Sequence, residues 1–321
     1  MDSIFLVELL QDIPGAPQYE LLSLSEKGNF EILRNTGDFY TIRGNWETLK
    51  RAAYVRRVVK IIGEGPDIGS FLAPELPPGK FYVRFQDAGN CHDSSIEPEI
   101  GDMLGGMGRV SFSNPDFVVR AYHLDKWYVG IELFSGIGRE FRARRAPMRP
   151  FFSPISIDPR HARFMVNISG TEEGETILDP FCGTGGILLE AGLLGRKVLG
   201  NDWSLQMSTG AKLNLKYFGV RDYRISNEDF LKMEISEPVG AIVTDFPYGK
   251  NSRLSEKNLE SLYGQSFSKF HQILPAGKVA VVVVSERGKL DLAKEYFEVV
   301  KVFEFRVHRS LTRYFAVLRR K

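Results

Sequence analysis

The stretch "TILDPFCGTGG", residues 176 to 186, joins a short apolar run to an acid and a glycine-rich turn. Asp179 ends the apolar run, and Gly183, Gly185 and Gly186 precede a segment with helical spacing. Glycines let the backbone approach a ligand closely, and open α/β sheets bind ligands at the carboxyl ends of their strands. The turn is neither GxGxxG nor GxxxxGK, because no lysine follows the glycines. It therefore predicts a ligand site on an α/β sheet without implying phosphate binding.

The chain from about residue 155 onward alternates strand-like and helical patterns, as in a parallel sheet covered by helices. The predicted strands are 176–181, 197–202, 224–230, 240–246 and 278–286, and the predicted helices are 185–194, 204–217 and 256–273. The final runs, "YFEVVKVFEFRV" and "TRYFAVLRR", predict a hairpin whose last strand turns back. We therefore expect six parallel strands and one antiparallel strand.

An arginine-dense, proline-punctuated stretch, "GREFRARRAPMRP" (138–150), precedes this sheet and predicts a domain boundary near residue 150. Residues 1–150 mix strand-like runs, such as "SIFLVELL" and "FYVRFQD", with helical spacing, which predicts an α+β region. The segment 45–62 is predicted to be a helix. Its basic side would carry Arg51, Arg56, Arg57 and Lys60, which is typical of a solvated face but also fits RNA.

The composition of the 321 residues, 43% hydrophobic and 26% charged, is that of a soluble globular protein. Only Cys91 and Cys182 occur, with no CxxC, so neither a disulfide framework nor a cysteine-rich zinc site is expected, and no metal site is predicted. The longest aliphatic run, 279–284, is far shorter than the ~20 residues of a membrane span, and the N-terminal run is too short for a signal peptide. These features predict a cytoplasmic protein.

The next two predicted strands also end in acids. Asp202, followed by Trp203, comes about 20 residues after the glycine turn, where an acid can bind both hydroxyls of a ribose. Asp229 and Phe230 end the third strand, where an adenine ring would lie. Each acid alone is typical of a helix cap or turn, but their succession favours one binding edge.

The fourth strand runs into "TDFPYG", residues 244 to 249. Proline and glycine also occur in plain turns. In the order "DPFCGTGG", "ND", "NED", "TDFPYG", however, the chain resembles Rossmann-like S-adenosylmethionine-dependent methyltransferases that methylate exocyclic amino groups, whose usual signature is DPPY. The resemblance implies S-adenosylmethionine as the cofactor. It implies these cofactor-binding residues: Asp179, Phe181, Gly183, Thr184, Gly185, Gly186, Asp202, Trp203, Asp229 and Phe230.

Two further stretches, 149–170 and 113–133, resemble the tRNA (guanine-N2)-methyltransferases of the archaeal and eukaryotic guanine-10 type. In that family a ferredoxin-like segment and a THUMP domain precede the catalytic domain. The resemblance implies tRNA as the substrate, N2 of guanine-10 as the target, and a small zinc-containing activator protein as a partner. Whether one or two methyl groups are added stays open.

The family's catalytic loop maps onto residues 245–248. The Asp245 carboxylate and the Phe246 backbone carbonyl would hold the two N–H bonds of the target amine, Pro247 would stiffen the loop, and Tyr248 would stack on the base. Phe246 replaces the family's usual first proline. We expect this departure to be tolerated, because every residue offers a carbonyl and the ring adds stacking or packing surface.

Basic residues near the predicted site are candidates for contacts with RNA phosphates. The loop between the last two strands should lie at the same edge as the other strand ends, although a solvated hairpin or linker would have the same pattern. The candidates are His308, Arg309 and Arg313 in that loop, and Arg139, Arg142, Arg144, Arg145 and Arg149 in the linker.

Three other functions share parts of this pattern. A DNA or other RNA amino-methyltransferase, acting on adenine N6 or cytosine N4, would have the same catalytic motif, but residues 1–170 resemble tRNA enzymes. Protein-glutamine methyltransferases usually begin the motif with Asn, and this chain has Asp245. A catalytically inactive RNA-binding module is disfavoured by the intact acids at the strand ends.

Overall fold

The computed structural model describes residues 3–70, 76–87, 95–105, 108–136, 139–154, 156–248, 256–309 and 311–321. The chain forms two compact units. The first comprises residues 1–10, 25–50 and 54–137, and the second comprises 11–24, 51–53 and 138–321. This division differs from the predicted boundary near residue 150, because the arginine-rich linker and two short N-terminal segments belong to the second unit.

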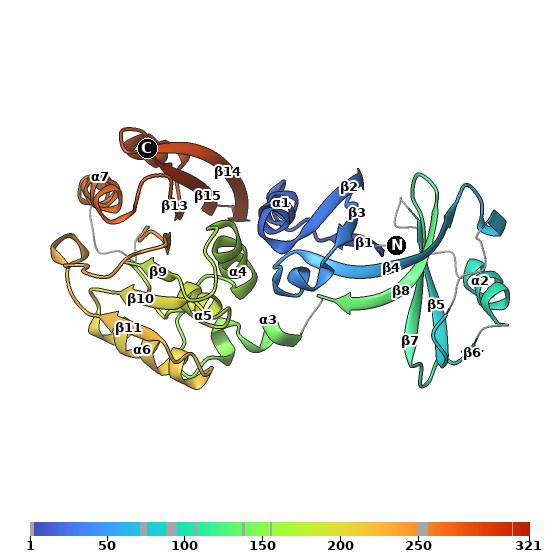
Figure 1. Cartoon of the computed structure of the whole chain (residues 1–321). Helices are drawn as coiled ribbons and strands as arrows, with labels where there is room; N and C mark the ends of the chain where they lie inside the picture. The colour runs from blue at the N-terminus through green and yellow to red at the C-terminus, as the bar shows by residue number, and fades with distance from the viewer. Residues whose placement is uncertain are drawn as a thin grey trace. The chain divides into compact units, whose positions relative to one another are not determined.

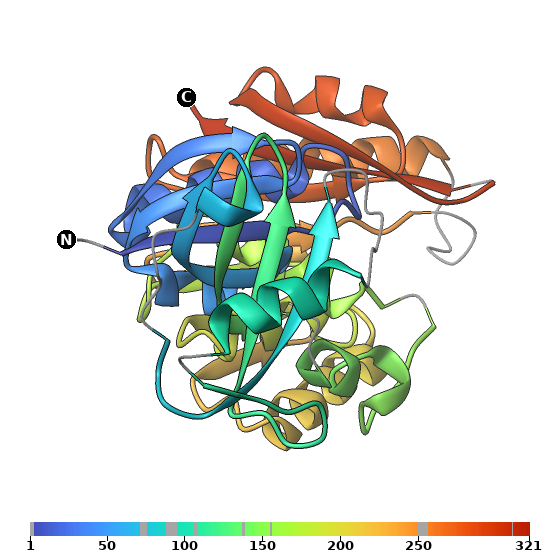
Figure 2. The ribbon, with the colours of Figure 1, turned by 90° about the vertical axis from the view of Figure 1, so that its right-hand side faces the viewer.

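The first unit is built on one eight-stranded mixed sheet of order β2-β3-β1-β4-β8-β7-β5-β6. Its strands are β1 (Ile4–Leu9), β2 (Phe30–Thr36), β3 (Phe39–Gly44), β4 (Val55–Gly65), β5 (Lys80–Asp87), β6 (Arg109–Val110), β7 (Phe117–His123) and β8 (Trp127–Ser135). Helix α2 (Ile96–Leu104) crosses one face of β5 and β7 (Figure 2), where Ile100 and Leu104 pack with Phe81 and Val83. The α+β character predicted for this region is confirmed.

The predicted helix over 45–62 is wrong. Only a short 3₁₀ turn, Trp46–Arg51, forms there, and β4 follows as a long strand between β1 and β8. Valine and isoleucine are stiff at χ1 and fit a pleated surface, so sheet pairing overrides the helical spacing of the apolar residues. The predicted basic helix face therefore does not form, and Arg56 and Arg57 both pair with Glu8 on β1.

The second unit contains a seven-stranded sheet of order β11-β10-β9-β12-β13-β15-β14 (Figure 1). Its strands are β9 (Thr176–Asp179), β10 (Lys197–Asn201), β11 (Tyr223–Ser226), β12 (Ala241–Asp245), β13 (Val279–Val284), β14 (Phe297–His308) and β15 (Leu311–Arg320). Strand β15 runs antiparallel to both β13 and β14, and the neighbouring pairs from β11 to β13 are parallel. The prediction of six parallel strands and one antiparallel strand is confirmed.

The second unit also contains α-helices. They are α1 (Ala16–Gly28), whose residues to Leu24 belong to this unit, α3 (Arg139–Ala143), α4 (Pro159–Ile168), α5 (Gly186–Gly192), α6 (Leu205–Tyr217) and α7 (Glu256–Ile273). Asp158 caps α4 by accepting from the Arg160 N–H, and Ser204 caps α6. On the face covered by α7, Phe267 and Phe270 pack with Phe246 in an aromatic part of the core.

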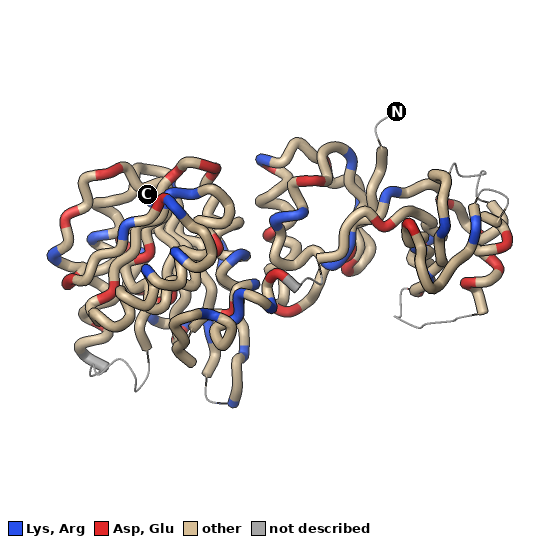
Figure 3. The backbone as a smooth tube through the Cα atoms, turned by 90° about the horizontal axis from the view of Figure 1, so that it is seen from below, with Lys and Arg blue, Asp and Glu red and all other residues tan. Residues whose placement is uncertain are grey.

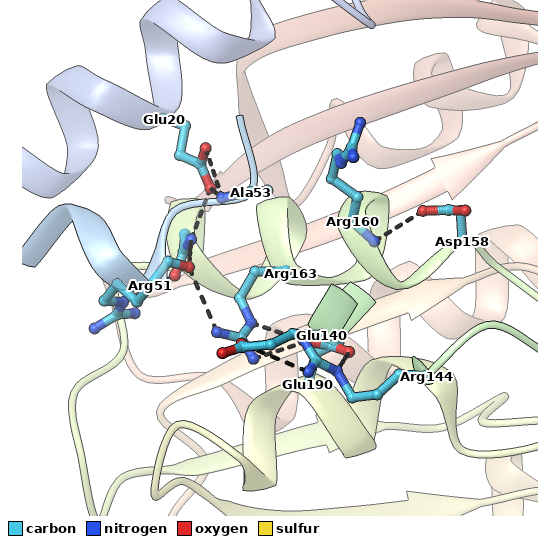
Figure 4. A network of polar contacts seen from close by, with 10 residues as sticks. Glu20, Arg51, Ala53, Glu140, Arg144, Asp158, Arg160, Arg163 and Glu190 are labelled. Atoms are coloured by element: carbon cyan, nitrogen blue, oxygen red, sulfur yellow. Dashed lines mark hydrogen bonds and ion pairs between the residues drawn. The ribbon is translucent and has the colours of Figure 1, made fainter. Parts of the chain in front are cut away.

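A buried polar network ties the N-terminal segments of the second unit to α4 and α5 (Figure 4). Glu190 is fully buried and accepts from Arg144 at 2.7 Å and from Arg163 at 2.9 Å. Arg51 donates to the Asn167 side chain at 2.9 Å, and Asn167 donates to Glu20 at 2.6 Å. Pairing offsets part of the cost of burying these charges. The hydrogen bonds of Asn167 with Arg51 and Glu20 join 51–53 and 11–24 to α4.

Charged residues are spread over both units. Positions of Lys and Arg are interspersed with positions of Asp and Glu along both parts of the chain, as Figure 3 shows. None of the helices described is long and apolar enough to cross a membrane. The cytoplasmic location stays a prediction.

Candidate active site

The glycine-rich turn after β9 adopts backbone angles that glycine favours. Gly183 has φ +51° and Gly185 has φ +78°, both in the left-handed region. A Cβ atom added at Gly183 would meet nothing within 4 Å, so open space lies beside this residue. Thr184, by contrast, is buried, and its hydroxyl contacts Ser156 and Arg149. The turn thus offers backbone to a ligand, while the Thr184 side chain anchors it from behind.

Asp179, at the end of β9, is held from the fourth strand end. Its Oδ1 accepts from the Thr244 hydroxyl at 2.6 Å and from the Phe181 N–H at 3.2 Å. Burial raises the pKa of this carboxyl to about 8, with Asp245 and Asp202 adding to the rise. The raised pKa favours the protonated form of Asp179, which limits like-charge repulsion with the other acids of the edge.

Asp202 joins the glycine turn to the second strand end. Its two carboxylate oxygens accept from the Gly183 N–H and the Ser204 N–H, each at 2.9 Å. Burial raises its pKa, and these two hydrogen bonds oppose the rise. Trp203, the next residue, is 69% exposed, which is unusual for so large an apolar ring. A fixed carboxylate beside an exposed aromatic surface fits the hydroxyls and the base of a nucleoside.

The third strand end differs in part from the prediction. Asp229 caps a 3₁₀ turn by accepting from the Leu231 N–H at 3.0 Å, and its side chain is half exposed. Phe230 is only 3% exposed and packs edge-on against Phe181. The Phe230 ring therefore supports the wall of the edge from the core, and it does not offer a free face to an adenine ring.

Asp245 lies at the end of β12, with one carboxylate oxygen beside Arg313 and the other without a hydrogen-bond partner among the described residues. Its Oδ2 lies 3.6 Å from Arg313 Nη2, whereas Oδ1 is buried and has no hydrogen-bond partner among the residues described. Burial raises the pKa of Asp245 to about 6, and Arg313 and the Tyr248 hydroxyl act against this rise. In its ionised form Asp245 presents an oxygen with no donor among the described residues, and an amino group would supply one.

Phe246 belongs to the hydrophobic core, whereas Tyr248 lies beside Asp245 and Arg313. Phe246 is 1% exposed, and its ring stacks on Tyr263 with centroids 4.3 Å apart. Pro247 accepts from the Tyr263 hydroxyl at 3.2 Å, so α7 also holds the loop. Tyr248 is half-buried, and its hydroxyl accepts from Arg313 Nε at 2.7 Å. Residues 249 and 250 of the loop lie outside the described residues.

The predicted RNA-contacting arginines separate into two groups. Arg144, Arg149 and Arg313 are buried and bonded inside the second unit, which argues against contact with an RNA backbone. Arg142 is exposed, and Arg145 is exposed and lies 3.6 Å from Asp158. Arg139 begins α3. His308 and Arg309 are exposed beside the β14–β15 turn, where their phosphate contacts stay a prediction.

Two residues that organise this edge were missed from the sequence. Asn201 is buried at the end of β10 and donates to the carbonyls of Pro180 and Glu228, which joins the first and third loops. Thr244 joins the first and fourth strand ends through Asp179. Asn201 directly precedes Asp202, and Thr244 directly precedes Asp245. A polar residue immediately before a strand-end acid is therefore the signal that the sequence offers for both.

The fold and the site define a Rossmann-like methyltransferase. A family model described as "RMKL-like, methyltransferase domain" matches residues 146–314. The crystal structure of TrmN from Thermus thermophilus has the same fold, with a TM-score of 0.62 at 19% identity over 99% of this chain and 100% of that chain.

Two curated relatives extend over nearly the whole chain. A tRNA (guanine(10)-N2)-dimethyltransferase of Pyrococcus abyssi is 36% identical over 98% of this chain and 99% of the relative. One of Methanothermobacter thermautotrophicus is 33% identical over 98% and 99%. This chain belongs to the tRNA (guanine(10)-N2)-dimethyltransferase family.

Proposed function

We propose that this protein transfers methyl groups from S-adenosylmethionine to the exocyclic N2 amino group of guanine-10 in tRNA. The single observation that supports the chemistry best is the buried Oδ1 of Asp245, which lacks a donor among the described residues and lies at the end of β12. The near full-length relatives named above support the substrate. Their name supports two successive transfers, giving dimethylguanosine.

The residues of the edge fit the cofactor. Asp202 would bind the ribose hydroxyls, exposed Trp203 would lie against the base, and the open space beside Gly183 would admit the amino-acid part. When bound, S-adenosylmethionine supplies an electrophilic methyl group on a sulfonium. The chain's own contribution is to hold the amine in line with that group.

The mechanism follows from the weakness of the nucleophile. The lone pair of a guanine amine is delocalised into the ring, so the nitrogen attacks poorly until it pyramidalises. Asp245 Oδ1 would accept one N–H, and the backbone carbonyl of Phe246 would accept the other. Positive charge develops on the nitrogen during transfer, and the ionised Asp245 would stabilise it. The new nitrogen–carbon bond would replace the methyl–sulfur bond, so that S-adenosylhomocysteine leaves, and the surplus amine proton would pass to Asp245 Oδ1. Tyr248 would stack on the base, which must leave its RNA stack at a cost of a few kcal/mol.

The remaining parts of the proposal concern RNA and partners. The first unit, with its α+β sheet, would bind tRNA as the ferredoxin-like and THUMP region of the family. The exposed His308, Arg309, Arg142 and Arg145 would contact phosphates. The zinc-containing activator rests on the family resemblance alone, and an assay with and without such a protein decides whether it is needed.

The test is methyl transfer from labelled cofactor to tRNA transcripts, followed by identification of the modified nucleoside. We expect N2-methylated guanosine at position 10 and no label in a transcript with adenosine there. Asp245→Ala should lower turnover by at least about 10²-fold, while the affinity for S-adenosylhomocysteine stays near that of the unmodified protein. Labelled N6-methyladenosine, or label in protein alone, would refute the proposal.

A further inference from the structure

Arg313 on β15 joins the two side chains to which the proposed function assigns chemistry. It is 9% exposed, its Nε donates to the Tyr248 hydroxyl at 2.7 Å, and its Nη2 lies 3.6 Å from Asp245 Oδ2. The guanidinium carbon also lies 5.7 Å from the centroid of the Tyr248 ring. One buried cation from the C-terminal hairpin thus reaches both ends of the segment 245–248.

We propose that Arg313 is a positioning residue of the methyl-transfer site, which occupies Asp245 Oδ2 and fixes the Tyr248 phenol so that Oδ1 alone faces the target amine. This inference rests on the proposed function of Asp245. Arg313 does not touch the substrate in this arrangement. It acts through the two residues that do.

The asymmetry of the carboxylate supports this role. The Arg313 guanidinium beside one oxygen restricts rotation of the Asp245 carboxylate, and the Tyr248 hydroxyl that Arg313 also holds interacts with the same carboxylate. The other oxygen is left with no protein donor in the described part of the chain. A buried acceptor of this kind costs stability unless a ligand completes it. Asp245 Oδ1 is therefore available to accept a hydrogen bond from an N–H group of a ligand.

The position of Arg313 separates it from the exposed residues of the same hairpin. His308 and Arg309 are exposed beside the turn, whereas Arg313 is enclosed and its donors point into the second unit. A phosphate contact would require those donors to face solvent. Substitution of an arginine that binds RNA phosphate would mainly change the affinity for tRNA and its salt dependence, whereas substitution of a positioning residue would change turnover.

The charges around Asp245 give this role a second observable. The titratable groups that interact with it are Asp179 on β9, Tyr248 in its own loop, Tyr263 on α7 and Arg313 on β15. Arg313 and Tyr248 lower the pKa of Asp245, and burial raises it. Removal of the guanidinium therefore leaves burial less opposed, and the carboxylate becomes harder to ionise.

The experiment compares Arg313→Met, Arg313→Lys and a control, Arg319→Met, in the full chain. Arg319 lies on the same strand, is half exposed and pairs with Glu298, outside the site. Turnover and KM for tRNA are measured from about pH 5.5 to 9. We expect Arg313→Met to lose about 10²-fold in turnover at pH 7 with KM for tRNA unchanged, and its acid limb to move to higher pH. Arg313→Lys should recover part of the loss, and Arg319→Met should match the unmodified protein.

A substrate-free measurement keeps this inference separate from the proposed function. The Asp245 carboxyl resonance, assigned by its absence in Asp245→Asn, is followed by carbon-13 NMR as pH changes. We expect its midpoint to rise in Arg313→Met and to stay in Arg319→Met. An unchanged midpoint, or a raised and salt-dependent KM for tRNA with normal turnover, would overturn the positioning role. Failure of the unmodified protein to methylate tRNA guanine would instead refute the proposed function.

Discussion

Replacing Phe246 with alanine should destabilise the second unit strongly, because this ring is buried in an aromatic cluster. Phe246 is 1% exposed and stacks on Tyr263, with Phe267 and Phe270 on its other sides. Burial of a phenylalanine side chain contributes roughly 1.5–3 kcal/mol, and an aromatic pair adds about 0.5–1.5 kcal/mol. With the cavity that remains, we expect Phe246→Ala to lower the free energy of unfolding by about 3–5 kcal/mol.

Proline, the residue usual in the family at this position, should cost more than alanine here. The Phe246 N–H donates to the Val283 carbonyl at 3.1 Å, and proline has no N–H. A buried carbonyl left without its donor costs about 1–3 kcal/mol further. Phe246→Leu fills most of the space and keeps the backbone, so it should be the mildest of the three substitutions.

Urea unfolding followed by circular dichroism measures these differences, with Phe152→Ala as the control. Phe152 is 52% exposed in the same unit, so its loss should change stability by no more than about 0.5 kcal/mol. A Phe246→Ala protein as stable as the control would refute the packing argument. Phe246→Leu should retain methyl transfer, because only the backbone carbonyl is assigned a role. Its inactivity in a folded protein would show that the ring acts directly.

Three further outcomes are expected. Asp202→Ala should weaken binding of S-adenosylhomocysteine by about 10- to 100-fold, measured by calorimetry, and an unchanged affinity would remove Asp202 from the ribose site. Glu190→Gln leaves the charge of Arg163 buried without its carboxylate and should cost about 3–5 kcal/mol; a thermal midpoint equal to that of the unmodified protein would contradict this. Turnover should fall as pH drops through about 6, because the proposed role of Asp245 needs its ionised form and burial raises its pKa to about 6. A turnover that stays constant down to about pH 4.5 would exclude this role of Asp245.

The sequence predicted the second unit well because its signals are local. Strands β9, β12 and β13 are short apolar runs, and the parallel direction of strands in such sheets brings their carboxyl ends to one edge. Asp179, Asp202 and Asp245 could therefore be placed together without a structure. The helix predicted over 204–217 differs from α6 (Leu205–Tyr217) only at its first residue.

What the sequence did not predict depends on partners far along the chain. The valine-rich segment after residue 54 satisfies helical spacing, but its pairing with β1 and β8 decides its conformation. Arg313 and Tyr248 are 65 residues apart, and Arg144 and Glu190 are 46 apart. The local sequence around an arginine does not show whether it pairs with an acid inside the protein or binds a phosphate of RNA.

The membership of residues 11–24 in the second unit has a consequence for synthesis of the protein. Tyr19 on α1 contacts the ring of Phe303 on β14, with centroids 5.4 Å apart. The ribosome releases the first of these residues long before it makes the second, so the N-terminal segment must wait while the intervening unit folds. A nascent or truncated chain that lacks the C-terminal hairpin has neither this contact nor Arg313. The proposed methyl-transfer site, with Arg313 in it, would therefore be completed only when translation is nearly finished.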